Sequence, residues 1–110
     1  MDNIINDILT DLVEGGGSHY WANFRNVKRD DDLNVISFEV KDDTEMPDWK
    51  IITAKEIEEA IEKMKNNYKE LHIGVRIAEQ FFGNREDWDY DADGIDCLLQ
   101  IAALQEVVYG

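Results

Sequence analysis

The sequence predicts an α+β domain in which a small three-stranded antiparallel sheet packs against about four helices. Apolar residues recur with helical spacing from Ile4 to Val13, and apolar and polar residues then alternate in short runs between His19 and Thr53. Helical spacing returns after Thr53 and continues to Glu106. The predicted order is α-β-β-β-α-α-α. Because the strands precede a group of helices, those helices are expected to cover one face of the sheet.

The first predicted element is an amphipathic helix from Met1 to Glu14. Its apolar stripe consists of Ile4, Ile5, Ile8, Leu9, Leu12 and Val13. Gly15-Gly16-Gly17 ends the helix, because glycine adopts the left-handed conformation after a helix without steric penalty. A phosphate-binding loop is a weaker interpretation of these glycines. They lack the G-x-x-x-x-G-K-[ST] spacing and follow a helix C-terminus, which carries the wrong end of the dipole for an anion.

Three short strands are predicted next, from His19 to Lys28, from Asn34 to Lys41 and from Trp49 to Thr53. Acid-rich turns at 29–34 and 42–48 separate them, and the second turn holds the only proline. Period-two alternation places one set of side chains on the core face of the sheet. This set is Tyr20, Ala22, Phe24, Ile36, Phe38 and Val40.

Three helices complete the predicted fold. Thr53 and Glu56 form a T-x-x-E capping box that starts a helix, which ends or bends at Asn66-Asn67. A third helix is predicted from Glu70 to Phe82, and a nearly apolar fourth from Ala92 to Glu106 is expected to be central. Residues 106–110 either end that helix or form a short edge strand. The predicted core contains Ile5, Leu9, Leu12, Phe38, Ile61, Val75, Leu98, Leu99 and Ala102, and residues 1–110 are expected to form a single domain.

The charge of the chain limits its partners. It carries 25 Asp and Glu against 11 Lys and Arg, a net charge of −14 in 110 residues. Such a field repels phosphate, so we expect no direct binding to DNA, RNA or an anionic membrane and an attraction to basic protein surfaces. No apolar run approaches the roughly 20 residues of a membrane span. A single cysteine, Cys97, and no secretory signal are typical of a cytoplasmic protein.

The acids are densest from Glu86 to Asp96, where six of eleven residues are carboxylates. Trp88 and Tyr90 lie among them, and both residue types are enriched at the energetic centres of protein interfaces. An alternative role for Trp88 is a lid over the start of the fourth helix. We predict a partner-binding surface made of Glu86, Asp87, Trp88, Asp89, Tyr90 and Asp91.

Part of this region resembles a calcium-binding loop. Asp89-x-Asp91-x-Asp93-Gly94 matches positions 1, 3, 5 and 6 of an EF-hand. Position 8 should be aliphatic but is Asp96, and position 12 should be Glu but is Gln100. We therefore expect no metal site, with Asp93 as the N-cap of the fourth helix. A calcium or small-ligand module at the Asp89–Gly94 loop remains an alternative.

The sequence contains few candidates for catalysis. His19, His72 and Cys97 are the only obvious nucleophiles or bases, no two are close in sequence, and none lies in a known signature. Cys97 falls on the apolar side of a predicted buried helix, where cysteine usually behaves as a small hydrophobic residue. A Cys–His pair assembled by the fold stays open. We expect no enzyme activity and no cofactor.

Two segments resemble a family of small, mostly uncharacterised proteins from bacteriophages and prophages. Glu14-Gly15-Gly16 followed by Tyr20-Trp21 is similar to an "EGG…YW" signature, and residues 91–110 are similar to a "DAxxADxxxQxALFGEVVYG" ending. Leu104 and Gln105 stand where that ending has Phe and Gly. The resemblance covers roughly the first 21 and last 20 residues. It implies a bacteriophage context inside a bacterial host cell and supplies no catalytic residues.

Charge and resemblance together predict a small acidic phage-type accessory protein that binds a basic host protein. The expected role is inhibition of a nucleic-acid-handling defence system, of anti-CRISPR or anti-restriction type, with carboxylates in place of phosphates. Besides the calcium or small-ligand module, a phage structural or assembly protein remains an alternative. In that case the acids would be a solvated face.

Overall fold

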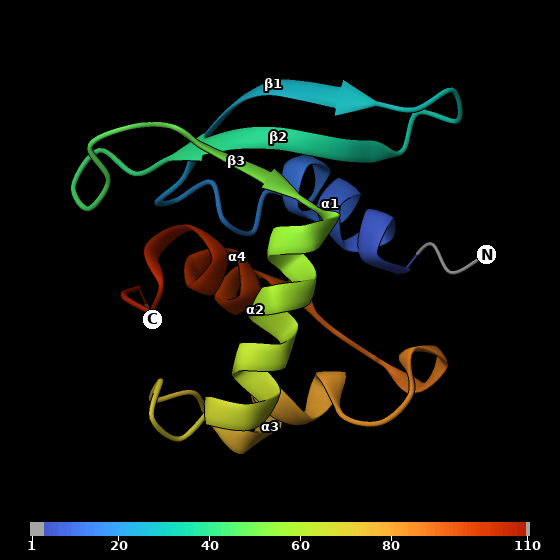
Figure 1. Ribbon diagram of the computed structural model, residues 1–110, viewed down its shortest axis with the longest axis vertical. Coiled ribbons are helices and arrows are strands. Elements are labelled where there is room, and N and C mark those ends of the chain that lie inside the picture. Colours follow the sequence, from blue (N-terminus) through green and yellow to red (C-terminus); the bar gives the residue numbers. More distant parts are fainter. Residues whose placement is uncertain (1–3, 110) are drawn as a thin grey trace.

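The computed structural model describes residues 4–109 and has the predicted α+β class and element order (Figure 1). The predicted helical positions Met1 to Asn3, and Gly110, lie outside the described residues. Two 3₁₀ turns, η1 and η2, interrupt the second half of the chain. The elements are α1 (Ile4–Glu14), β1 (Asn23–Arg29), β2 (Val35–Lys41), β3 (Lys50–Thr53), α2 (Ala54–Asn67), α3 (Val75–Ala78), η1 (Glu79–Phe81), η2 (Arg85–Asp87) and α4 (Ala92–Leu104).

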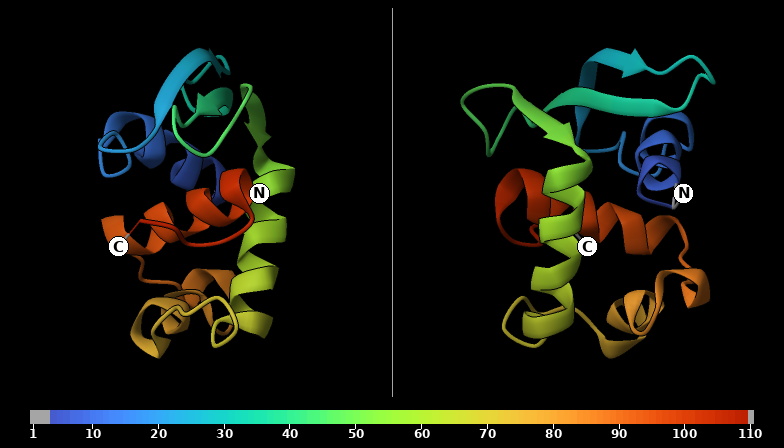
Figure 2. Two further views of the ribbon diagram at one scale, coloured as in Figure 1. Left: turned by 90° about the vertical axis from the view of Figure 1, so that its left-hand side faces the viewer. Right: turned by 45° about the vertical axis from the view of Figure 1, so that its right-hand side comes forward.

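The sheet has the order β1-β2-β3, and both strand pairs are antiparallel. Figures 1 and 2 show α1 and α4 on one side of the sheet, α2 running away from the end of β3, and α3 at the far end. The core lies between the sheet and these helices. Side chains from each layer are exposed by 1% or less, including Leu12, Phe38, Ile52, Ile57 and Leu98. As predicted, α4 is central: it contacts α1, α2, α3 and β3.

The predicted helix boundaries hold where local sequence signals are strong. Gly16, two residues after the end of α1, has φ +75°, which confirms the glycine stop. At the start of α2 the capping box is present, with the Thr53 N–H donating to Glu56 Oε1 at 2.7 Å and the Lys55 N–H donating to Thr53 Oγ1 at 3.2 Å. The buried face of α2 consists of Ile57, Ala60, Ile61 and Met64, of which Ile61 was predicted as core.

The predicted third helix is wrong in both extent and face. The chain turns beyond α2 until His72, which has φ +59°, and the Ile73 N–H donates to Tyr68 O at 2.8 Å. This is a Schellman-type ending with His72 in the left-handed position. Gly74 is extended, so α3 begins only at Val75, and it ends one turn later at Ala78, where η1 follows. Val75 is 50% exposed, whereas Ile73 and Phe81 are buried in this region. Of the nine residues predicted to form the core, from Ile5 to Ala102, Val75 alone is not buried.

Two strand predictions are also wrong. Residues 18–22 form a turn closed by the Ala22 N–H on Ser18 O at 2.9 Å, so β1 begins at Asn23 and Tyr20 is 60% exposed. Ile36 is exposed and Val35 is buried. The β1–β2 register is irregular between Arg25 and Arg29, and the Val35 N–H donates to a side chain of α1, Thr10 Oγ1. Phe38 and Val40 face the core as predicted.

The C-terminal residues form neither of the predicted structures. α4 ends at Leu104, two residues before the predicted end, and Gln105 has a left-handed backbone with φ +69°. Residues 107–109 are irregular and fold back on α4. The N–H groups of Val108 and Tyr109 both donate to Gln100 Oε1, at 2.9 and 2.8 Å. Two backbone donors are thus satisfied by one buried amide instead of by a strand.

Candidate functional site

The predicted contact residues 86–91 run from within η2 to the start of α4, and we refer to them as the acidic segment. After the 3₁₀ turn the backbone is extended at Trp88, with φ −69° and ψ 133°. Glu86, Asp87, Asp89 and Asp91 are exposed, whereas Trp88 and Tyr90 are half-buried. The segment therefore presents four carboxylates to solvent while its two aromatic rings are partly withdrawn.

Both aromatic rings pack against Phe81, a fully buried residue of η1. The Trp88 ring meets it edge-on with centroids 5.5 Å apart, and the Tyr90 ring stacks on it at 6.0 Å. The Trp88 indole N–H is buried and has no hydrogen-bond acceptor among residues 4–109. Trp88 is thus mainly a packing residue, and only part of its ring is available to a partner.

A hydrogen bond ties the acidic segment to α1. The Tyr90 hydroxyl donates to Asp11 Oδ2 at 2.8 Å. Burial, then the hydrogen bond and charge of Asp11, and then the charge of Asp7 raise the pKa of Tyr90. The phenol therefore stays protonated and keeps its bond to Asp11 throughout the physiological pH range. The acidic surface extends in this way from the segment onto α1.

Asp91 has a structural task at the start of α4. Its Oδ1 accepts from the Gly94 N–H at 2.9 Å and from Gln80 Nε2 at 3.2 Å, and its own N–H donates to Gln80 Oε1 at 2.9 Å. Asp91 is therefore the N-cap, and the prediction of Asp93 for that position is wrong. Asp93 lies two residues further, in the first turn of α4, where its charge still suits the positive end of the helix dipole.

The same geometry bears on the calcium alternative. An EF-hand needs its first positions in a loop that wraps the ion. Here α4 begins at Ala92, so Asp93 and Gly94 are already helical, and Asp91 is used as a cap. Among residues 4–109, no three or more His, Cys, Asp or Glu side chains are grouped so that they could hold a metal ion. The Asp89–Gly94 stretch is built as a helix start.

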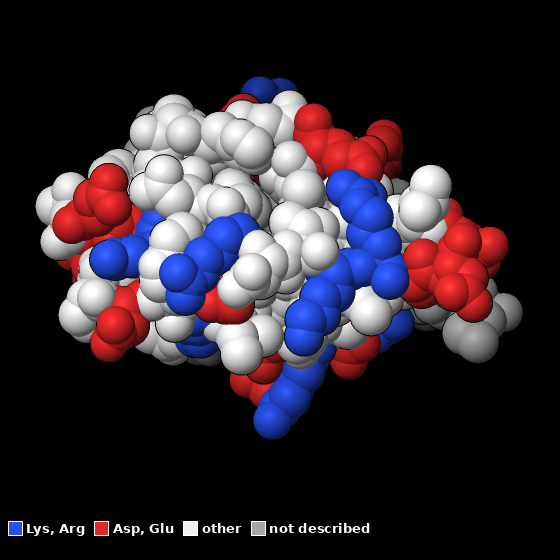
Figure 3. Space-filling view, turned by 90° about the horizontal axis from the view of Figure 1, so that it is seen from above, with Lys and Arg blue, Asp and Glu red and all other residues white. Residues whose placement is uncertain are grey.

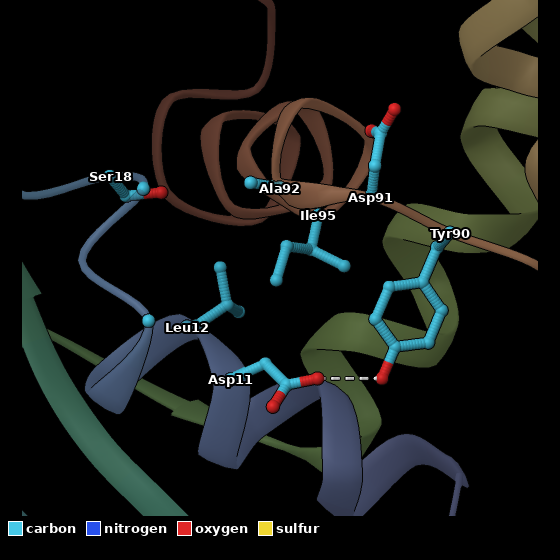
Figure 4. A pocket seen from close by; sticks show the side chains of 9 residues that line it. Asp11, Leu12, Ser18, Tyr90, Asp91, Ala92 and Ile95 are labelled. Atoms are coloured by element: carbon cyan, nitrogen blue, oxygen red, sulfur yellow. Dashed lines mark hydrogen bonds between the residues drawn. The ribbon is translucent and has the colours of Figure 1, made fainter.

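A hollow of about 220 Å³ opens beside the acidic segment, between the end of α1 and the start of α4 (Figure 4). Leu12 and Ile95 project toward its middle, and the bond between Asp11 and Tyr90 closes one end. The Asp91 carboxylate points away from it. The full lining is Asp11, Leu12, Gly15, Gly17, Ser18, Tyr90, Asp91, Ala92 and Ile95. The sequence predicted Tyr90 and Asp91 as site residues but not the contribution of α1 and its glycine loop.

The cationic residues are not spread evenly over the molecule. On the side of the sheet that α1 and α4 leave open, Lys and Arg gather over the middle and Asp and Glu lie toward both ends (Figure 3). Exposed Arg25, Lys28 and Arg29 come from β1. Arg25 pairs with Glu39 at 3.0 Å and lies over the Trp49 ring at 4.1 Å. The acidic segment is on another part of the surface, below and to the right in Figure 1.

The candidates for nucleophilic catalysis do not form an activated pair. His72 and Cys97 line the same hollow, of about 560 Å³. Burial, followed by the charges of Asp96, Asp93 and Asp91, raises the pKa of the Cys97 thiol to about 11. The thiol is thus protonated at neutral pH, which is the opposite of what a catalytic cysteine requires. His19 lies elsewhere, with Nε2 3.2 Å from Val13 O.

The sequence did not predict the polar network around Asp96, which is only 8% exposed. Its oxygens accept from Ser18 Oγ, Tyr20 OH and Trp21 Nε1, and from Gln100 Nε2 at 3.0 Å. Gln100 in turn binds the chain at 108–109. The network therefore joins residues 18–21, α4 and the C-terminal residues. The sequence feature that could have indicated this network is the pair Asp96 and Gln100, two polar residues one helical turn apart on a nearly apolar helix.

In the described part of the chain, every helix is too short or too polar to span a bilayer. Comparisons of the chain with protein-family models, with curated proteins and with solved structures found no match.

Proposed function

We propose that this is a non-enzymatic binding protein whose acidic segment docks on a basic surface of a partner protein. The observation that carries the proposal is the construction of the segment. Its carboxylates are exposed on a backbone that two aromatic anchors on Phe81 hold in place. A segment whose backbone is already held in place loses less conformational entropy on binding than a mobile one.

The partner class follows from the electrostatics. A net charge of −14 accelerates encounter with basic surfaces and disfavours nucleic acid as a direct ligand. Basic grooves that bind nucleic acid are the surfaces most complementary to this field. We therefore propose a nucleic-acid-handling host protein as the partner. Together with the resemblance to phage proteins, this points to an inhibitor of an anti-CRISPR or anti-restriction kind that acts in the bacterial cytoplasm.

The test begins with the immobilised protein and a lysate of a bacterial host, and captured proteins are identified by mass spectrometry. The decisive step uses the captured protein after purification. Its binding to labelled DNA or RNA is measured by fluorescence anisotropy with increasing amounts of the acidic protein. We expect the nucleic acid to be displaced. If an excess leaves that binding intact, the proposal of nucleic-acid mimicry is wrong, even when the two proteins associate.

A matched pair of variants separates the segment from the overall charge. Glu86→Lys, Asp87→Lys and Asp89→Lys together should slow association and flatten its salt dependence, since steering is screened over about 8 Å at physiological salt. Asp43→Lys, Glu45→Lys and Asp48→Lys change the net charge equally but lie in the β2–β3 loop, where all three residues are exposed. Equal effects of the two triple variants would mean that the net charge of the protein, and not the acidic segment, determines association.

A further inference from the structure

We propose that the hollow between α1 and α4 is a receptor for one basic side chain of the partner, an arginine or a lysine. The inference rests on the proposed function, because Tyr90 and Asp91 belong both to the acidic segment and to the wall of the hollow. The volume of about 220 Å³ is below the range of roughly 300–1,000 Å³ that drug-sized ligands need. It suits a single side chain.

The interior of the hollow is apolar. Leu12 and Ile95 form its middle and are exposed by only 1% and 6%, and the methyl group of Ala92 lies above them (Figure 4). At the glycine loop, a Cβ on Gly17 would approach the Ala92 Cβ to 3.3 Å, so the loop closes tightly on α4. Such a surface accommodates the aliphatic stem that lysine and arginine bury while their charged ends reach polar groups.

The rim of the hollow offers acceptors where the charged end of such a side chain would lie. Asp11 uses Oδ2 for the Tyr90 hydroxyl, and its Oδ1 has no hydrogen-bond donor among residues 4–109. The Tyr90 O–H is used in its hydrogen bond to Asp11, so the hydroxyl oxygen presents only lone pairs to the hollow. Gly15 lies at the C-terminal end of α1, where the helix dipole also favours a positive charge.

Other occupants fit this lining less well. An anion would face the charge of Asp11 and the C-terminal end of α1. A neutral aliphatic side chain would cover Leu12 and Ile95 but would leave the Asp11 carboxylate without a cationic partner and partly desolvated. An ammonium or guanidinium on an apolar stem satisfies both parts of the site.

The test uses the whole protein and four probes: N-acetylated, C-amidated arginine, lysine, norleucine and glutamate. Norleucine resembles lysine without its charge. Each is titrated into ¹⁵N-labelled protein and followed by amide chemical shifts. We expect arginine or lysine to shift the amides of Gly15, Gly17, Ala92 and Ile95 in a saturable way, and the other two probes not to do so. Shifts with norleucine equal to those with lysine would overturn the proposal, as would cationic shifts spread evenly over all the acidic residues.

Variants assign the effect to the hollow. Asp11→Asn keeps an acceptor for Tyr90 but removes the charge, and it should weaken cation binding by up to about fivefold, the upper limit for an exposed ion pair. Ala92→Leu fills the hollow and should abolish saturable binding. Asp43→Asn, an exposed acid of the β2–β3 loop, is the control and should change nothing. Circular dichroism of each variant establishes that it is folded. Unchanged cation binding in folded Ala92→Leu would contradict the proposal.

The outcomes for the hollow and for the proposed function are separable. Saturable cation binding at the hollow without any displacement of nucleic acid from a captured partner would support the receptor and contradict the inhibitor. Displacement of nucleic acid that Ala92→Leu leaves unaltered would support the inhibitor and contradict the receptor.

Discussion

The acidic segment and α4 are adjacent in sequence and treat their carboxylates in opposite ways. Glu86, Asp87 and Asp89 lie in solvent, whereas Asp96 is buried and accepts hydrogen bonds from four side chains. All four residues belong to the same eleven-residue run of high charge, from Glu86 to Asp96. The difference teaches that charge density in a sequence does not by itself identify a contact surface, because one of its acids organises the interior.

This comparison predicts its largest effect at Asp96. Asp96→Ala leaves the buried donors of Ser18 and Trp21 without their acceptor, at about 1–3 kcal/mol each. We expect a loss of about 3–5 kcal/mol in the free energy of unfolding, measured by urea denaturation. Asp89→Ala in the acidic segment should cost less than about 0.5 kcal/mol. Similar losses in the two variants would break the comparison.

The apolar residues provide a second test of the same contrast. Leu98 on α4 is fully buried, whereas Val75 on α3 is half exposed although both were predicted as core. Leu98→Ala should lower the free energy of unfolding by about 2–5 kcal/mol. Val75→Ala should lower it by less than about 0.5 kcal/mol. A large loss for Val75→Ala would mean that the predicted third helix forms in solution after all.

The reactivity of Cys97 provides a chemical test of burial on α4. Its pKa of about 11, against an ordinary value of 9.0, leaves about a hundredfold less thiolate than in an exposed cysteine peptide at pH 8. Alkylation by iodoacetamide should be correspondingly slow and should rise until about pH 11. Because the folded pKa is the higher one, the associated stability is present below about pH 9 and is lost as the pH rises through about 11. Rapid alkylation at pH 7 would show an activated thiol and reopen the Cys–His pair.

The smallest predicted effect concerns the end of α4. Gln105 is held at φ +69°, a conformation that glycine adopts without steric cost. Gln105→Gly should therefore raise the free energy of unfolding by about 0.5–1 kcal/mol, measured by urea denaturation. Glu106→Gly, at a neighbouring exposed position without the left-handed backbone, should not be stabilising. Destabilisation by Gln105→Gly would mean that its side chain contributes more than the relief of strain.

Local chemistry determined much of this protein from sequence alone. Helical spacing identified α1, α2 and α4, the Thr53–Glu56 capping box placed the start of α2, and the glycines placed the end of α1. These signals act over three or four residues, so they operate before any tertiary contact forms. The exposure of the acidic segment followed from its charge, since an unpaired carboxylate is costly to bury.

Only the tertiary structure decided which residues meet. Asp96 could be buried because Ser18, Tyr20, Trp21 and Gln100, spread over 83 residues of chain, converge on it. The left-handed turn at His72, beyond the end of α2, and the exposure of Val75 depend on how the chain turns back to bury Ile73 and Phe81. The hollow beside Tyr90 exists because the glycine loop after α1 approaches the start of α4. Each outcome depends on contacts between segments that are distant in sequence, and a local sequence pattern does not predict which distant segments come together.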